Sequence, residues 1–243
     1  MGPGQKTKTK TYCYDFPMVS VTVDCVIFGW DNDGLHVLLI ERGEEPFEGQ
    51  WALPGGFIRA GEEDLEKAAR RELSEETGIG SPRHLEQLGT YGHPDRDPRE
   101  EHVITVAYIA LIKRDEHRPQ GGTDARSAHW IPMEEARRKR LAFDHDQIFS
   151  DAVERLYNKL RYDPLGFNLL PNKFPLRDVQ QLYEVAIGHE VDKRNFRKKL
   201  LETGLLEDTQ EIETDVKHRA AKLYQFNWTA YQKRRAEGWT FDI

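Results

Sequence analysis

The first half of the chain alternates apolar runs with short polar segments. Residues 19–29 and 36–42 are rich in β-branched and aromatic side chains, which favour extended strands. The segment 31–34 between them reads Asp-Asn-Asp-Gly, a turn signal, so we predict that the two runs form a β-hairpin. Further apolar runs over 103–112 and 128–133 predict a third and a fourth strand.

Two other segments of this half have apolar residues at helical spacing. Residues 62–77 and 146–161 are both predicted to be helices, the second with Ile148, Val153 and Leu156 on one face. Strands with helices between them indicate an α+β fold. We predict an α/β/α sandwich with a mixed sheet.

The pattern changes in the last 70 residues. Residues 176–187 carry an apolar stripe, and residues 193–201 follow Asp192, a residue type that favours a helix start. A polar loop is expected over 208–219, and alternating faces predict a strand over 222–226. Helix, turn, helix and hairpin in this order are typical of a winged helix-turn-helix.

These patterns divide the chain into four parts. The boundary between the two folded parts falls where Pro164 and Gly166 interrupt the pattern after a long helical stretch. The predicted parts are a flexible basic tail (1–14), the sandwich domain (15–162), a linker (163–172) and the winged-helix domain (173–243).

Charge sharpens this division. The 243 residues include 35 Lys and Arg against 42 Asp and Glu, for a net charge of −7, which argues against a uniformly basic nucleic-acid binder. Residues 1–170 hold 22 basic and 30 acidic residues, whereas residues 171–243 hold 13 and 12. No apolar run reaches the ~20 residues of a membrane span, and no export signal precedes the two cysteines. We therefore expect a cytoplasmic protein with no membrane partner.

Three glutamates on the helix at 62–77 suggest metal chemistry. Glu72, Glu75 and Glu76 are spaced so that they project from one helix face, where like charges repel. Such a cluster suits Mg²⁺ or Mn²⁺, although a solvated acidic helix is the ordinary alternative. Arg71 is placed to orient a carboxylate, and Gly55-Gly56 allows the backbone to approach a ligand.

The whole segment from Gly55 to Ile79 resembles the Nudix box, G-x5-E-x7-R-E-U-x-E-E-x-G-U, where U is a bulky aliphatic residue. The resemblance implies the Nudix fold and a divalent metal at the three glutamates. Between Gly56 and Arg71 lie 14 residues, where the family pattern has 13. The first glutamate of the box is therefore Glu62 or Glu63. The register of the helix favours Glu63, and the extra residue makes hydrolytic activity uncertain.

The polar loop 92–102 is the second source of candidate chemistry. Its carboxylates, with Glu101 as our candidate, are possible general bases beside a metal-bound water, and Glu76 is the candidate catalytic glutamate of the box. The loop resembles that of ADP-ribose-type Nudix enzymes and their regulatory relatives. This resemblance implies phosphate or ribose contacts by Arg96, Arg99 and Arg42. We interpret His145 as a helix-entry residue without a ligand role.

The predicted second helix of the winged motif concentrates positive charge. Five of the seven residues 193–199 are basic, and Phe196 and Leu200 are spaced to anchor the opposite face. A solvated charged face is the alternative, but in this motif the helix is expected in a DNA major groove. The predicted DNA contacts are Lys193, Arg194, Asn195, Arg197 and Lys198, with Lys217 and Arg219 in the wing.

A Nudix domain followed by a winged helix resembles the Nudix-related transcriptional regulators, whose members control NAD metabolism or sugar catabolism. The resemblance implies a homodimer that binds double-stranded operator DNA and senses ADP-ribose or a related metabolite. Typical members carry Gly-Arg-Pro-Ala before the last strand, whereas residues 217–221 here read Lys-His-Arg-Ala-Ala, so the wing contacts are expected to differ. The alternative is a Mg²⁺-dependent pyrophosphohydrolase of ADP-ribose-type nucleotides.

Overall fold

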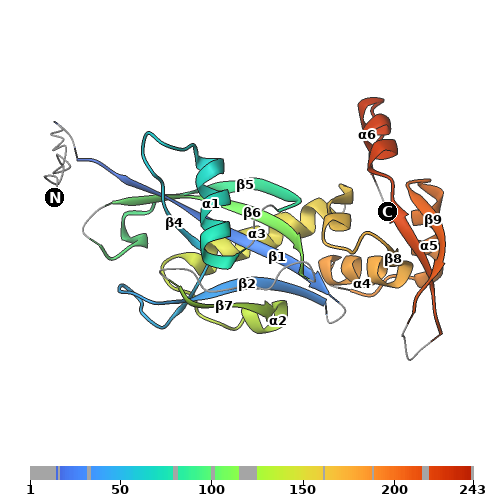
Figure 1. Cartoon of the computed structure of the whole chain (residues 1–243), viewed down its shortest axis with the longest axis horizontal. Helices are drawn as coiled ribbons and strands as arrows, with labels where there is room; N and C mark the ends of the chain where they lie inside the picture. The colour runs from blue at the N-terminus through green and yellow to red at the C-terminus, as the bar shows by residue number, and fades with distance from the viewer. Residues whose placement is uncertain are drawn as a thin grey trace, which may run out of the picture.

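The computed structural model describes most of the chain and divides into a sheet-centred half and a smaller helical half (Figure 1). The described residues are 15, 17–31, 34–78, 82–99, 102–114, 125–160, 162–187, 189–214 and 219–241. Among these residues, no helix is long and apolar enough to cross a membrane.

A seven-stranded mixed sheet forms the first half. Its strand order is β3-β2-β1-β6-β5, with β4 paired to β1 and β7 paired to β2. The β1–β6 pair is parallel and the other pairs are antiparallel. The strands are β1 Ser20–Asp31, β2 Gly34–Arg42, β3 Trp51–Ala52, β4 Gly55–Phe57, β5 His84–Tyr91, β6 Val103–Lys113 and β7 Ala125–Pro132.

The predicted hairpin is confirmed, because Asp31 pairs with Gly34 where β1 turns into β2. The predicted third and fourth strands are β6 and β7. Strand β5 was missed, because its sequence HLEQLGTY is half-buried and mixes polar with apolar residues without regular alternation. The short strands β3 and β4 were missed as well, and β4 contains the Gly55-Gly56 segment.

Helices cover both faces of this sheet, which confirms the predicted α/β/α sandwich (Figure 1). Val23, Cys25 and Ile27 of β1 pack in one cluster with α1 (Leu65–Thr77). The alternate residues Val26 and Phe28 pack in a second cluster with α3 (His145–Leu160). The period of two along a strand sends successive side chains to opposite faces. The short helix α2 (Met133–Ala136) follows β7.

Six of the ten residues of the predicted linker 163–172 are buried in the structure. This segment includes the 3₁₀ helix η3 (Pro164–Asn168), and the side chains of Leu165, Phe167 and Leu170 are at most 5% exposed. These side chains belong to the same hydrophobic cluster as α3 and the C-terminal half. A continuous apolar core therefore joins the two halves.

The C-terminal half has the predicted order of helix, turn, helix and hairpin. A strand of two residues, β8, and a last helix, α6, were not predicted. Strand β9 also occupies much of the segment that we expected to be a polar loop, because cross-strand pairing with β10 orders it. The elements are β8 Phe174–Pro175, α4 Leu176–Ile187, α5 Lys193–Glu202, β9 Leu206–Ile212, β10 Lys222–Phe226 and α6 Trp228–Ala236.

Candidate functional site: a polar pocket and an exposed basic helix

The Nudix-box glycines allow β4 to lie close against both β1 and α1. A Cβ atom on Gly55 would collide with the backbone of Val23, and one on Gly56 would stand 2.5 Å from Oε1 of Glu72. The backbone N–H of Gly55 donates to Oε2 of Glu76 at 2.8 Å. Gly55 is therefore required by the close approach of this backbone to β1, and Gly56 by its approach to the helix that carries the glutamates.

Helix α1 begins and ends with capping residues of the usual types. Asp64 caps its start by accepting a hydrogen bond from the Lys67 N–H at 2.8 Å, and Gly78 ends it with φ of 73°. The predicted helix started at residue 62, whereas Glu62 and Glu63 precede the cap. The extra residue of the box thus lies in the loop before the helix, and the spacing within the helix is kept.

Arg71 is the centre of an ion-pair network. Its Nη2 donates to Oε1 of Glu63 at 2.6 Å and its Nη1 to Oε1 of Glu72 at 2.6 Å, while Glu75 accepts at 3.1 Å. Hydrogen bonds from Arg71 lower the pKa of Glu63 to about 2. The box arginine therefore pairs with Glu63 and not with Glu62. Arg71 was a candidate ligand contact, but it is not among the residues that line the cavity described below.

Each of the three candidate metal ligands has a protein partner in this structure. Glu72 is bound by Arg71, Glu75 by Arg59 and Arg71, and Glu76 by the Gly55 N–H. Burial raises the pKa of Glu72, opposed by the hydrogen bond from Arg71. Among the described residues, no group of three or more His, Cys, Asp or Glu side chains is arranged to hold a metal ion. Nudix enzymes usually employ a divalent metal, but these carboxylates are engaged by Arg71, Arg59 and the Gly55 N–H and do not form a metal site as they stand.

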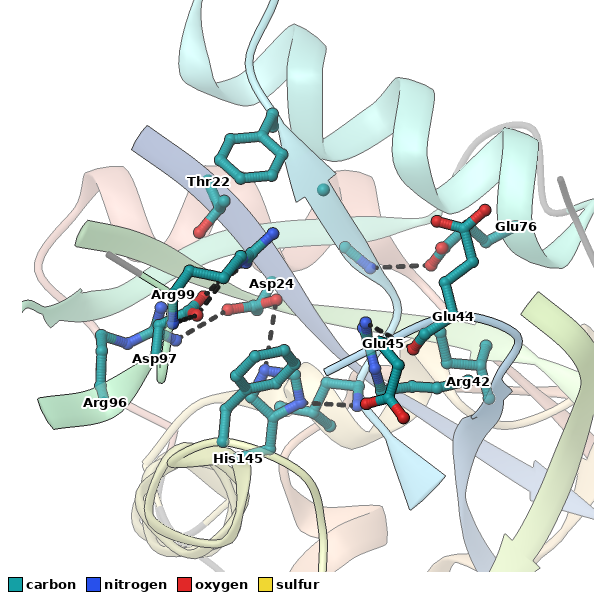
Figure 2. A pocket seen from close by; sticks show the side chains of 16 residues that line it. Thr22, Asp24, Arg42, Glu44, Glu45, Glu76, Arg96, Asp97, Arg99 and His145 are labelled. Carbon is teal, nitrogen blue, oxygen red and sulfur yellow. Dashed lines mark hydrogen bonds and ion pairs between the residues drawn. The ribbon is translucent and has the colours of Figure 1, made fainter. Parts of the chain in front are cut away.

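A polar cavity of about 180 Å³ lies beside the box (Figure 2). It is lined by residues of β1, β2, β4, the 3₁₀ helix η1 (Pro94–Arg96) and the start of α3. Arg96 and five other predicted site residues meet at the wall of this cavity. The five are Arg42, Gly55, Gly56, Glu76 and Arg99.

Arg96 is positioned by the carboxylates of Asp144 and Asp24. Its Nε and Nη2 donate to the two oxygens of Asp144 at 2.9 and 2.8 Å, and Nη2 also donates to Oδ2 of Asp24 at 3.4 Å. The Arg96 side chain is only 3% exposed. A guanidinium held in this way orients the carboxylates of Asp144 and Asp24, and little of its surface is left for a ligand.

Asp24 and His145 form the base of the same cavity and were both missed as site residues. Nε2 of His145 lies 3.5 Å from Oδ1 of Asp24, and its Nδ1 accepts a hydrogen bond from the Leu53 N–H at 2.9 Å. Burial opposes ionisation of Asp24, but the charges of His145 and Arg96 hold its pKa below the ordinary value. The signal available in the sequence was a lone carboxylate inside the apolar run 19–29. His145 begins α3, as predicted, and its side chain also lines the cavity.

Arg42 and Arg99 flank an aromatic side chain at the cavity wall. The guanidinium carbons of Arg42 and Arg99 lie 4.9 and 5.9 Å from the ring centroid of Phe143. Arg42 donates to the backbone oxygens of Pro46 and Glu44, whereas Arg99 is paired with Asp97. Burial and the charge of Arg99 lower the pKa of Arg42. Two neighbouring guanidinium groups disfavour each other, so an anion between them would stabilise both.

Two predicted site residues cannot be placed. Glu101, the candidate base of the loop, and Lys217 of the wing lie outside the described residues. Asp95 is exposed, and Asp97 is buried and engaged by Arg99, whose hydrogen bonds lower its pKa against the effect of burial. The described part of the loop therefore contributes Arg96, Asp97 and Arg99 to the cavity wall.

Helix α5 presents a basic face to solvent. Asp192 caps its start by accepting from the Asn195 N–H at 2.7 Å, and Phe196 and Leu200 are buried as predicted. The expected DNA contacts Lys193, Arg194, Asn195 and Lys198 are exposed, whereas Arg197 is half-buried. Arg219, at the end of the wing, is exposed as well.

Two acidic residues of the wing hairpin, Glu211 and Glu213, are paired with cations from neighbouring segments. Glu211 accepts a hydrogen bond from Nζ of Lys173 at 2.5 Å, and Glu213 is bound by Arg177 with an Nη1–Oε2 distance of 2.7 Å. The hydrogen bonds to Glu213 raise the pKa of Arg177. These pairs reduce the repulsion that the wing would otherwise exert on a phosphate backbone.

Two family models match separate parts of the chain. The NUDIX domain model matches residues 18–152, and the model of the NrtR DNA-binding winged helix domain matches residues 166–226. The chain is 40% identical over 213 residues to the ADPR responsive transcriptional repressor NtrR of Acinetobacter baylyi, which spans 87% of this chain and 84% of that protein.

Two solved structures of Shewanella oneidensis NrtR are also similar. The crystal structure of that protein complexed with a 27mer DNA has a TM-score of 0.73 and 35% identity, covering 85% of this chain and 93% of that one. The cocrystal structure of its NUDIX domain with ADP ribose has a TM-score of 0.54 and 38% identity, covering 59% and 94%. The chain therefore belongs to the Nudix family and carries an NrtR-type winged-helix domain.

Proposed function

We propose that this protein is a transcriptional regulator that binds operator DNA through its winged helix and senses ADP-ribose, or a related metabolite, in its Nudix domain. The observation that carries the proposal is the basic face of α5, where Lys193 and Arg194 are exposed in a winged-helix fold. The relatives named above, a repressor responsive to ADP-ribose and a protein crystallised with DNA, support the same reading. The site of action is the cytoplasm.

The DNA contacts follow from the placement of α5. Its exposed cations suit phosphates, and Arg194, Asn195 and Arg197 are the candidates for base edges in a major groove. The wing adds Arg219 and Lys217 to the proposed contacts. A winged helix reads one half-site, so we propose a homodimer that reads two half-sites about one helical turn apart.

The effector site is the cavity between Arg42, Arg99 and the Gly55-Gly56 segment. A nucleoside diphosphate sugar brings two phosphates, which suit the pair of guanidinium groups, and a base that suits stacking on an aromatic ring. Phe143 and the 44% exposed ring of Phe57 are the aromatic groups of this cavity. The Nudix domain of a relative crystallised with ADP ribose supports this choice of ligand.

The direct test is fluorescence anisotropy with a labelled duplex of the intergenic DNA beside the protein's own gene. We expect tight binding whose affinity falls as salt rises, because Lys and Arg displace counterions from the phosphates. Added ADP-ribose is expected to weaken the binding, since it favours a different domain arrangement. Binding that shows no preference over an unrelated duplex at any ADP-ribose concentration would contradict the proposal.

The second candidate is a pyrophosphohydrolase of ADP-ribose-type nucleotides that depends on Mg²⁺ or Mn²⁺. It is favoured by the presence of Glu72, Glu75 and Glu76 in the Nudix box, with Glu76 or Glu101 as the base. The ion pairs of Glu72 and Glu75 with Arg71 and Arg59 favour the sensor instead. A panel of nucleotides with each metal decides between them, with Glu76→Gln as control, and turnover abolished by that substitution would establish the enzyme.

A further inference from the structure

The helix that borders the effector cavity also supports the winged helix. Asp144 directly precedes α3 and binds Arg96, and His145 is the first residue of α3 and lies at the cavity base. The helix has 16 residues and is therefore about 24 Å long. Its last residue, Leu160, is fully buried against the segment that leads into the winged helix.

The far end of α3 meets α4 across a single glycine. A Cβ atom on Gly166 would lie 2.7 Å from Cδ2 of Leu160 and 2.9 Å from Cδ2 of Leu182 in α4. Leu160 and Leu182 are 0% and 1% exposed, so a methyl group added at Gly166 would have to displace buried side chains. Gly166 thus allows the two helices to approach through η3, and its backbone has no positive φ to explain the glycine otherwise.

The contact continues from α4 to the helix proposed to read DNA. Tyr183 of α4 packs on Phe196 of α5 with ring centroids 5.4 Å apart, and both rings are buried. Along the Nudix domain, α3 is held to β5 by side-chain bonds such as that from the Tyr91 hydroxyl to Asp151 at 2.8 Å. Ile148 and Leu156 of α3 are also buried in the apolar core that contains Phe28 of β1, and close-packed contacts of this kind transmit a shift of the helix to its neighbours.

We propose that effector binding at the start of α3 is relayed to the winged helix through the contact of Leu160, Gly166 and Leu182, which we name the Gly166 joint. This inference rests on the proposed function, since it describes how that sensor acts. An anionic ligand placed beside His145 and Asp24 changes the forces on the first turn of α3. The Gly166 joint then moves α4, and with it α5, relative to the half-site of the partner copy in a dimer.

The test measures coupling separately from binding. With the full-length protein, isothermal titration calorimetry gives the Kd of ADP-ribose, and anisotropy gives the Kd of the intergenic duplex without and with saturating ADP-ribose. The ratio of the two DNA Kd values is the coupling factor, which must be the same in both directions. We expect a factor of at least about tenfold for the wild-type chain, within the usual range for coupled sites.

Gly166→Ala is expected to reduce the coupling factor at least about fivefold, while each Kd measured with one ligand alone stays within about threefold of wild type. Gly29→Ala is the matched control, because a Cβ there would also be overpacked, 2.8 Å from the Trp130 ring, but within the sheet. It is expected to keep the wild-type factor. Should Gly166→Ala fail to fold, the nearly volume-conserving Leu182→Met carries the same expectation.

The outcomes separate the two proposals. A wild-type chain whose DNA affinity does not respond to ADP-ribose overturns the proposed function. A responsive wild type whose coupling is unchanged in Gly166→Ala, or equally reduced in Gly29→Ala, overturns the Gly166 joint alone. Loss of DNA binding by Gly166→Ala in the absence of ADP-ribose would also overturn it, because the glycine would then be needed merely to build the winged helix.

Discussion

Cationic side chains have opposite surroundings in the two halves of the molecule. In the Nudix half, Arg71 and Arg96 are enclosed by carboxylates and hold the site together. On α5, Lys193 and Arg194 are exposed, and no ion pair to either is formed within the described residues. All four side chains carry a positive charge. The neighbours of a cation, and not its charge, therefore distinguish a positioning group from one that is available to a ligand.

The strongest challenge to this comparison is the replacement Arg96→Met. It leaves Asp24 and Asp144 without their shared cation, and we expect the free energy of unfolding to fall by about 3–5 kcal/mol. Urea denaturation measures this change. The control is Arg70→Met, whose exposed pair with Glu66 is expected to contribute less than about 0.5 kcal/mol. Equal losses for the two variants would remove the distinction drawn for Arg96.

On the other side of the comparison, Lys193→Ala/Arg194→Ala is expected to leave stability unchanged and to weaken DNA binding by about 30-fold, or about 2 kcal/mol. The slope of log affinity against log salt should fall by about one for each cation that contacts a phosphate. Anisotropy at several salt concentrations measures both quantities. The control is Lys67→Ala, which removes an exposed cation of α1. A similar loss of DNA affinity in that variant would mean that DNA binding does not depend on the basic face of α5.

A smaller effect is expected for Arg42→Met, which tests a half-buried cation of the Nudix half. Among the described residues, the Arg42 side chain donates hydrogen bonds only to the backbone oxygens of Pro46 and Glu44, so it is the arginine of the cavity most available to an anion. We expect ADP-ribose binding to weaken about tenfold, near 1.4 kcal/mol, with DNA binding unaffected in its absence. Calorimetry decides this, and an unchanged Kd would move the phosphates away from Arg42.

The smallest effect concerns pH. The pKa of Asp24 is lowered in the folded state, so the folded protein binds this proton less tightly than the unfolded chain. Its contribution to stability is present above the ordinary carboxyl pKa, near 4, and is lost as pH falls through the lowered value. Asp24→Asn is therefore expected to lose less stability than wild type between pH 5 and pH 3 in thermal melts. A steeper loss in the variant would reverse the sign that we assign.

Local patterns predicted most of the fold. The hairpin at 31–34, the Asp192 cap of α5 and the anchors Phe196 and Leu200 depend on residues close in sequence, and each was expected. Strand β5 is ordered by its pairing with β6, and a sequence pattern cannot report such long-range pairing when the strand is half-polar.

The sequence predicted which segments line the cavity, but it did not predict the side-chain partners of their charged residues. The glycines and arginines of the cavity were found, but Asp24 was overlooked because its neighbours in β1 are apolar and buried. Arg96 was expected to touch the ligand, and its two carboxylates lie 72 and 48 residues away in sequence. Only the folded chain brings such partners together, and they decide whether a charge is available.

The parallel pairing of β1 with β6 has a consequence for the order in which the molecule assembles. Ser20 pairs with Val103, so about 80 residues must be synthesised and looped before this ladder closes. The cavity needs still more of the chain, because Asp144 and His145 come from the start of α3. A nascent chain therefore has no effector site until its sheet is complete. A ligand that binds only the folded protein shifts the folding equilibrium toward the folded state. Under the proposed function, the free energy of unfolding therefore rises with the concentration of the effector.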